Sequence, residues 1–190
     1  MLLFSKFFIV ITVVIGLIVD VPDPAVMQRP PREPGSKIVN RSQVIRWFVT
    51  GFLIAATALA VLAWGPGKPS TAHPSINMTM AFAVVSLSAV NLGLVMRRER
   101  EPVWSRPVFP YLGWIILGWI LTWAAVELHM LQRLLDTTSL TGGQWLAVIG
   151  LSLIAPAAVA LDKGIQFRRE RKTDIASIRT DVRLGLKPAR

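Results

Sequence analysis

Four long stretches of the sequence contain no charged residue, and this feature restricts the possible fold more than any other. They are Trp47–Trp64, Ile76–Met96, Val108–Val126 and Trp145–Leu161. A transmembrane helix needs about 20 mostly apolar residues to cross about 30 Å of hydrocarbon, and a backbone in lipid must satisfy its own hydrogen bonds. We therefore predict an all-α fold, a polytopic transmembrane helical bundle with four full spans.

A fifth apolar stretch, Phe7–Val19, is shorter and follows Lys6. A basic start before an apolar run also describes a secretory signal peptide, but no small-x-small cleavage site follows Val19. We interpret it as a short N-terminal membrane segment. The predicted organisation is a membrane segment at 1–20, a cytoplasmic proline- and arginine-rich connector at 21–46, a four-helix transmembrane region at 47–161 and a basic cytoplasmic tail at 162–190.

The basic residues predict the orientation of the spans. The chain has 21 Lys and Arg against 11 Asp and Glu, and 18 of the 21 fall in the connector, in the 97–107 loop or after the last span. The positive-inside rule places those three regions in the cytoplasm of a cell-membrane protein, with the N-terminus outside and the loops around 65–75 and 127–144 facing outward. The positive charge is then explained by the orientation of the spans in the membrane, so the expected partner is the lipid bilayer and not nucleic acid.

The basic tail leaves two interpretations open. Its apolar residues lie near helical spacing with arginines between them, as in a helix that rests on anionic headgroups. An ordinary solvated, partly disordered tail fits equally well. The apolar residues are Ile175, Ile178, Val182 and Leu186.

Smaller features support the bundle. Trp47 and Trp64 bracket one span at the depth that tryptophan favours. The pairs Gly51/Ala55 and Ala89/Gly93 have the small-x-x-x-small spacing that lets helices approach closely.

The sequence offers little catalytic or metal-binding chemistry. There is no cysteine, and the four spans contain no ionisable residue. Asn91 is the one amide in mid-span. We favour a hydrogen bond between helices for this side chain over coordination of an ion through its oxygen. His73 and His129 lie on different outward loops, and Asp162-Lys163-Gly164 is interpreted as a helix end at the membrane surface. We expect no catalytic residue, no metal site and no cofactor.

The segment after the first apolar stretch is the most distinctive in the sequence. Residues 21–32 read VPDPAVMQRPPR, and four prolines in this run exclude a helix interior. We predict an extended, stiff connector, followed by a helix that starts at Asn40 or Ser42, both good N-caps. The segment resembles the connector between the sixth and seventh transmembrane helices of P-type cation-transporting ATPases of the calcium-pump-like class. The matching residues are Asp23, Met27, Arg29, Pro30, Pro31 and Arg32.

Two further segments support this resemblance, which covers roughly residues 7–170. Met78-Thr79-Met80-Ala81-Phe82 is similar to the start of the family's eighth helix, and Gln144-Trp145-Leu146 is similar to the opening of its tenth. The resemblance implies the C-terminal transmembrane region of such a pump. The actuator domain, the phosphorylated loop and the nucleotide-binding domain of a complete pump have no counterpart in the sequence.

The resemblance also identifies where ion ligands are expected. The sixth-helix positions that carry an Asn and an Asp in the family correspond to Phe7 and Val10, and neither can bind a cation. Near the ligand position of the eighth helix stand Ala89 and Asn91, so Asn91 alone is a candidate relic of the ion path. The resemblance thus implies a membrane protein that is not an active pump, or any enzyme, by itself.

Two other functions stay open at this point. The chain can be an accessory or regulatory membrane subunit that associates with a P-type ATPase or another membrane complex. An independent channel or carrier is disfavoured, because the four spans lack charge.

Overall fold

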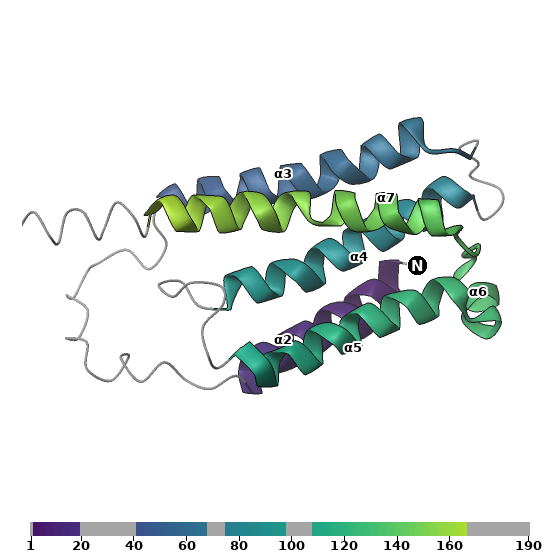
Figure 1. Cartoon of the computed structure of the whole chain (residues 1–190), viewed down its shortest axis with the longest axis horizontal. Helices are drawn as coiled ribbons and strands as arrows, with labels where there is room; N and C mark the ends of the chain where they lie inside the picture. Colours follow the sequence, from purple (N-terminus) through teal and green to yellow (C-terminus); the bar gives the residue numbers. More distant parts are fainter. Residues whose placement is uncertain (1, 20–40, 68–74, 98–107, 167–190) are drawn as a thin grey trace, which may run out of the picture.

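The computed structural model of the chain describes residues 2–19, 41–67, 75–97 and 108–166 as helices joined by short turns. Figure 1 shows the long helices running side by side as one bundle, with α3 and α7 along one edge and α2 and α5 along the other. No strand occurs within the described ranges. The helices are α1 (Leu2–Phe4), the π-helix η1 (Ser5–Val10), α2 (Ile11–Val19), α3 (Arg41–Trp64), α4 (Ile76–Met96), α5 (Val108–Glu127), α6 (His129–Leu135) and α7 (Gly142–Ser152).

Helix α4 forms the centre of the bundle and packs against α2, η1, α3, α5 and α7. In its most apolar window 67% of the residues are buried, against 17% for α3 and 22% for Gly142–Gln166. Val84, Leu87 and Val90 of α4 are completely buried. Helix α3 and the segment Gly142–Gln166 therefore turn most of their own apolar surface outward, as expected in a lipid environment where outer surfaces need no water-compatible face.

The predicted transmembrane helical bundle is confirmed. Helices α3 and α4 and the segment Gly142–Gln166 are each long and apolar enough to cross a membrane. Helix α5 meets the same criterion together with α6, to which it is bent by 79°. The fifth apolar stretch, Phe7–Val19, is a shorter helix, as expected. The chain is thus an integral membrane protein, with four spans when the bent pair counts as one.

Two helix boundaries differ from the sequence-based expectation, and a third falls between the two starts that the sequence offered. The segment 127–144 was expected as a loop, but it contains α6, whose C-cap Asp136 adopts a left-handed conformation with φ 54°. Helix α7 begins at Gly142 instead of Trp145, because Thr141 and Gln144 form a capping box. Helix α3 begins at Arg41, so Ser42 lies inside the helix and is not its N-cap. The other candidate cap, Asn40, lies outside the described residues.

The last span is interrupted near its middle. After α7 ends at Ser152, the chain makes one turn at Leu153 and continues as a helix through residues 154–166. Pro156 follows the turn and has no N–H to give to the carbonyl four residues earlier, so the regular hydrogen-bond ladder cannot pass this point. The helix also continues past Asp162-Lys163-Gly164, which were interpreted as its end.

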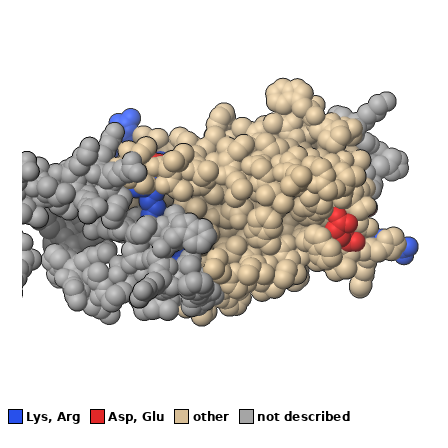
Figure 2. All heavy atoms as spheres, in the orientation of Figure 1, with Lys and Arg blue, Asp and Glu red and all other residues tan. Residues whose placement is uncertain are grey.

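Among the residues whose side chains the structure describes, charge lies at the two ends of the bundle. Figure 2 shows a broad uncharged belt, with basic and acidic side chains only beyond it on the face that is drawn. We call the end that carries Arg41, Arg46, Arg97 and Lys163 the basic end, and the opposite end, where α5 meets α6, the Glu127 end. This separation has the form of a membrane-spanning body with polar residues at two interfaces.

Close helix approach occurs at one of the two predicted small-residue pairs. A Cβ atom added to Gly93 of α4 would collide with Val13 of α2 and would lie 2.8 Å from the Tyr111 hydroxyl of α5. Gly93 therefore allows three helices to meet at one level, as the spacing indicated. At Gly51 such an atom would meet nothing within 4 Å among the described residues, so the other pair does not face a helix there.

Candidate functional site

The buried polar side chains gather on α4, the central helix. Asn77, Thr79, Ser86 and Ser88 are completely buried, and Asn91 is 9% exposed. A polar group in hydrocarbon is costly without a hydrogen-bond partner. The partners of these groups therefore indicate whether the residues join helices or are left to hold a ligand.

Asn91 joins α4 to α5. The indole N–H of Trp119 donates to Asn91 Oδ1 at 3.1 Å, which is the hydrogen bond between helices that the sequence favoured. Asn91 Nδ2 is buried and has no hydrogen-bond partner among the described residues. An amide nitrogen is a donor and cannot bind a cation. A role of Asn91 in an ion path stays a prediction.

Ser88 joins α4 to the interrupted last span. Its hydroxyl donates to the backbone carbonyl of Ser152 at 3.2 Å in a buried position. In a regular helix that carbonyl would accept the N–H of residue 156, and a proline at this position has none. The hydroxyl of α4 therefore satisfies the carbonyl that Pro156 leaves open.

The two positions that the family resemblance identifies for ion ligands lie on the π-helix η1. Phe7 is 60% exposed, and Val10 is half-buried. Neither side chain has an oxygen or nitrogen atom, so these two positions offer a cation only backbone carbonyls. Calcium requires six to eight oxygen ligands, usually with carboxylates among them. No cluster of three or more His, Cys, Asp or Glu residues occurs in the part of the chain that the structure describes.

The residues of the predicted connector motif lie outside the described residues. They are Asp23, Met27, Arg29, Pro30, Pro31 and Arg32. His73 lies outside them as well, whereas His129 is the exposed first residue of α6.

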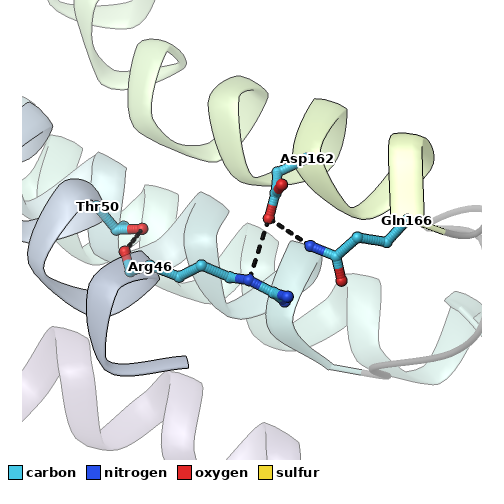
Figure 3. Close-up of polar contacts among 4 residues, drawn as sticks. All are labelled: Arg46, Thr50, Asp162 and Gln166. Carbon is cyan, nitrogen blue, oxygen red and sulfur yellow. Dashed lines mark hydrogen bonds and ion pairs between the residues drawn. The ribbon is translucent and has the colours of Figure 1, made fainter. Parts of the chain in front are cut away.

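At the basic end, polar side chains join α3 and α4 to the last helix. Arg46 Nε lies 3.3 Å from Asp162 Oδ2, and Gln166 Nε2 donates to the same oxygen at 2.7 Å. Figure 3 shows Arg46 reaching across from α3 to this carboxylate. Lys163 Nζ donates to the Val95 carbonyl at 3.1 Å, near the C-terminus of α4. A cation is favourable there, because the last carbonyls of a helix lack partners and carry partial negative charge.

These side chains border a pocket of about 500 Å³ between α3, the end of α4 and the last helix. Its charged and amide side chains are Gln43, Arg46, Asp162, Lys163 and Gln166, and its apolar walls include Val49, Leu53, Met96, Ala158 and Val159. The pocket is thus polar toward the basic end and apolar toward the interior of the span.

At the Glu127 end, a carboxylate and an amide hold the turns between helices. Glu127 Oε1 accepts the Trp145 indole N–H at 2.9 Å and the Leu140 N–H at 3.3 Å. Asn77 Oδ1 accepts the Gly67 N–H at 2.8 Å. Asn77 Nδ2 donates to the Gly67 carbonyl at 2.6 Å and to the Leu62 carbonyl at 3.3 Å. These contacts satisfy backbone groups at helix ends, which would otherwise lack partners.

Asn77, Glu127 and Asp162 are structural residues that were not predicted from the sequence. A signal for Asn77 was available, since it is an amide in the first turn of an otherwise apolar helix. Glu127 and Asp162 both stand where an apolar span ends, a place where charge is ordinary. Their partners lie on other helices and cannot be found from the local sequence.

The chain is similar in sequence to known proteins. Residues 1–165 match the sequence model of a family described as "Cation transporting ATPase, C-terminus". Over 139 residues the chain is 30% identical to a protein of Bacillus subtilis (strain 168) named calcium-transporting ATPase. This alignment covers 71% of the chain and 15% of the relative, so the chain spans only a small part of that protein's length.

Proposed function

Because the chain belongs to the family of cation-transporting ATPase C-terminal regions, we propose that it is a supporting membrane domain of a cation pump that neither hydrolyses ATP nor transports ions by itself. Membrane location and membership of a cation-pump family are given by its apolar helices and by the family match. The role of this domain within the pump is the part that we propose.

The observation that carries this proposal is the chemistry at the expected ligand positions. Phe7 and Val10 supply no ligand atom, and the Asn91 carboxamide oxygen already accepts a hydrogen bond from Trp119. The polar side chains of α4 instead bond to neighbouring helices, as Ser88 does to the Ser152 carbonyl. Because these interior polar groups already make hydrogen bonds within the bundle, they favour a packing role for the domain over ion binding.

The proposed partner is the remainder of a P-type pump, in the same polypeptide or in a separate one. The N-terminal helices support this, because they carry bulky apolar side chains on their outer face. Phe7 is 60% exposed, Phe8 57%, Ile18 76% and Val19 64%. Either lipid or further helices must cover this face, and we propose that further helices of the pump do so.

An accessory or regulatory subunit is the second candidate, and it is favoured by a different face. On α3, Phe48 is 76% exposed and Phe52 73% exposed, four residues apart on one side of the helix. A subunit that docks on a complete pump, or on another membrane complex, would use such a face.

For the orientation, we propose that the basic end lies in the cytoplasm and that the protein resides in the cell membrane. The basic end carries Arg41, Arg46, Arg97 and Lys163. The described charged residues of the Glu127 end are one basic residue, Arg133, and two acidic residues, Glu127 and Asp136. The positive-inside rule supports this direction.

The first experiment tests activity. The 190-residue chain is reconstituted in lipid vesicles beside the Bacillus subtilis calcium-transporting ATPase as a positive control. We expect from the chain no calcium-dependent ATP hydrolysis, no ATP-driven calcium uptake and no passive ion flux. Any of these activities above the empty-vesicle level would overturn the proposal.

A second experiment separates the two partner proposals. A photo-crosslinking amino acid is placed at Phe8 or at Phe52 in cells that contain a P-type pump. Crosslinks from Phe8 to pump helices support the pump-domain proposal. Crosslinks from Phe52 alone to a complete pump or another complex support the accessory subunit.

A further inference from the structure

We propose that the pocket at the basic end binds one anionic phospholipid, with its phosphate between Arg46 and Lys163 and its acyl chains along the apolar walls. This inference rests on the membrane location of the chain and not on its role in a pump. The following features of the pocket support it.

The pocket extends from the charged surface into the depth of the span. Gln43 and Leu53 both line it and are ten residues apart on α3, which corresponds to about 15 Å along the helix axis. Val159 and Ala158 continue the apolar wall on the facing helix. An anion without a tail would occupy only the polar part, whereas a phospholipid matches both parts.

The polar part carries the charge that a phosphate requires. Arg46 and Lys163 contribute two positive charges and Asp162 one negative charge, so the lining is net positive. Asp162 contacts Arg46 through Nε, which leaves the terminal nitrogens of the guanidinium directed away from the ion pair, as Figure 3 shows. A guanidinium fork matches two phosphate oxygens, and an ammonium group acts beside it as a compact charge.

Asp162 serves to position Arg46 and not to bind the lipid. Its Oδ2 is held by Gln166 at 2.7 Å as well as by Arg46. The carboxylate therefore keeps the long arginine side chain in one orientation and lowers the conformational entropy that binding would otherwise cost.

The surroundings of the pocket are those of a membrane interface. Trp47 lines the pocket and is 55% exposed, and Ile45 and Val49 beside it are 53% and 52% exposed. Tryptophan favours headgroup depth, and exposed aliphatic side chains next to it are normally covered by lipid. A bilayer lipid is thus present at this position at high local concentration, and the pocket selects one by its headgroup charge.

The test compares lipids and charge variants of the full chain in detergent micelles. The melting temperature is measured while phosphatidylglycerol or phosphatidylcholine is titrated in. We expect phosphatidylglycerol to raise it saturably and phosphatidylcholine to have little effect. The variants R46Q and K163Q should each weaken the apparent phosphatidylglycerol affinity about fivefold or more.

Arg41 provides the matched control, because it lies on α3 at the same end and is not part of the pocket lining. R41Q should bind phosphatidylglycerol as the unchanged chain does. An equal loss in R41Q, R46Q and K163Q would show a general surface attraction and overturn the proposal. So would an equal response to phosphatidylcholine.

A fourth variant and a soluble probe complete the test. V159W fills the apolar part and should abolish the phosphatidylglycerol response without removing a charge. Glycerol 3-phosphate tests the headgroup chemistry without acyl chains and should not stabilise the chain. Stabilisation by glycerol 3-phosphate equal to that by the lipid, or a full lipid response in V159W, would overturn the lipid assignment.

Discussion

Asn77 holds the turn between α3 and α4 with a single side chain. It satisfies the N–H and carbonyl of Gly67 and the Leu62 carbonyl near the end of α3. Asn77 itself is completely buried, and its three hydrogen bonds are partly buried. Replacement would leave three backbone groups of this turn without their present partners at the Glu127 end of the bundle.

We predict that N77A lowers the free energy of unfolding by about 1–3 kcal/mol or more, the usual cost of buried unsatisfied groups. The measurement is an SDS-denaturation titration in micelles. T57V is the control, since the Thr57 hydroxyl bonds only to a carbonyl of its own helix, that of Ile54. A loss in N77A no larger than in T57V would contradict the assigned role.

Two tryptophans of α5 provide a second comparison at the residue scale. Trp119 donates to Asn91, whereas Trp123, one turn later, is 53% exposed. W119F keeps an aromatic ring but removes the donor, so we expect a loss of about 1 kcal/mol in the same titration. W123F should change stability by less than half of that loss. Equal effects of the two variants would argue against the bond to Asn91.

The sequence predicted the role of Asn91 but not its partner. An amide in a charge-free span must find a hydrogen-bond partner, and another helix is the nearest source. The choice of Trp119 depends on the rotation of α5 against α4, which is set by packing. The small space at Gly118, where an added Cβ would lie 2.8 Å from Val90 Cγ2, is part of that packing. For the same reason the partners of Asn77 and Glu127 were beyond sequence reasoning.

At the scale of the helix, the interruption of the last span depends on two residues far apart in sequence. Pro156 removes the donor for the Ser152 carbonyl, and Ser88 of α4 replaces it at 3.2 Å. Ser152 Oγ also donates to the Ile149 carbonyl at 2.9 Å. The Ile149 carbonyl is therefore satisfied from within the broken segment, whereas the Ser152 carbonyl depends on packing against α4.

A double-mutant cycle measures this dependence. S88A alone should cost about 1–2 kcal/mol, because a buried carbonyl loses its donor. In a P156A background the restored N–H can reach that carbonyl, and S88A should then cost close to nothing. The difference between the two losses is the coupling energy, and additive effects would refute the link between the proline and the serine.

Two glycines on different helices show how far a sequence pattern predicts helix contact. Gly93 and Gly51 both belong to small-x-x-x-small pairs, but only Gly93 faces other helices among the described residues. The motif gives the spacing of small residues and not the direction in which that side of the helix points. Helix α4 has 67% of its most apolar window buried against 17% for α3, so a small residue on α4 more often meets a neighbour.

We therefore predict opposite results for the same substitution. G93A should destabilise the bundle by about 1–3 kcal/mol, because the new methyl group must displace Val13 or Tyr111. G51A should be neutral or slightly stabilising, because alanine is the better helix former and has open space there. Thermal unfolding in micelles of fixed composition measures both. A destabilising G51A would show that another chain covers this face.

For the whole molecule, the sequence predicted four full spans, against three, or four with the bent pair counted as one, in the described residues, but it did not predict their arrangement. The length of a charge-free stretch identifies each span, because the thickness of the hydrocarbon core sets how many apolar residues a span needs. The sequence indicates the central position of α4 only weakly, through the row of hydroxyl and amide side chains on this helix. The sharp bend between α5 and α6 follows Glu127, whose partners Leu140 and Trp145 lie beyond the next turn. Long-range contacts of this kind set the arrangement and leave no local pattern.

The orientation of the whole molecule gives the last prediction, and the absence of cysteine makes its test direct. Ser42 at the basic end and Ser139 near the Glu127 end are both exposed, so S42C and S139C form a matched pair. If basic residues are retained in the cytoplasm, a membrane-impermeant maleimide should label S139C in intact cells. S42C should react only after the cells are permeabilised. The reverse pattern would place the basic end outside, and with it the pocket that we assign to an anionic lipid.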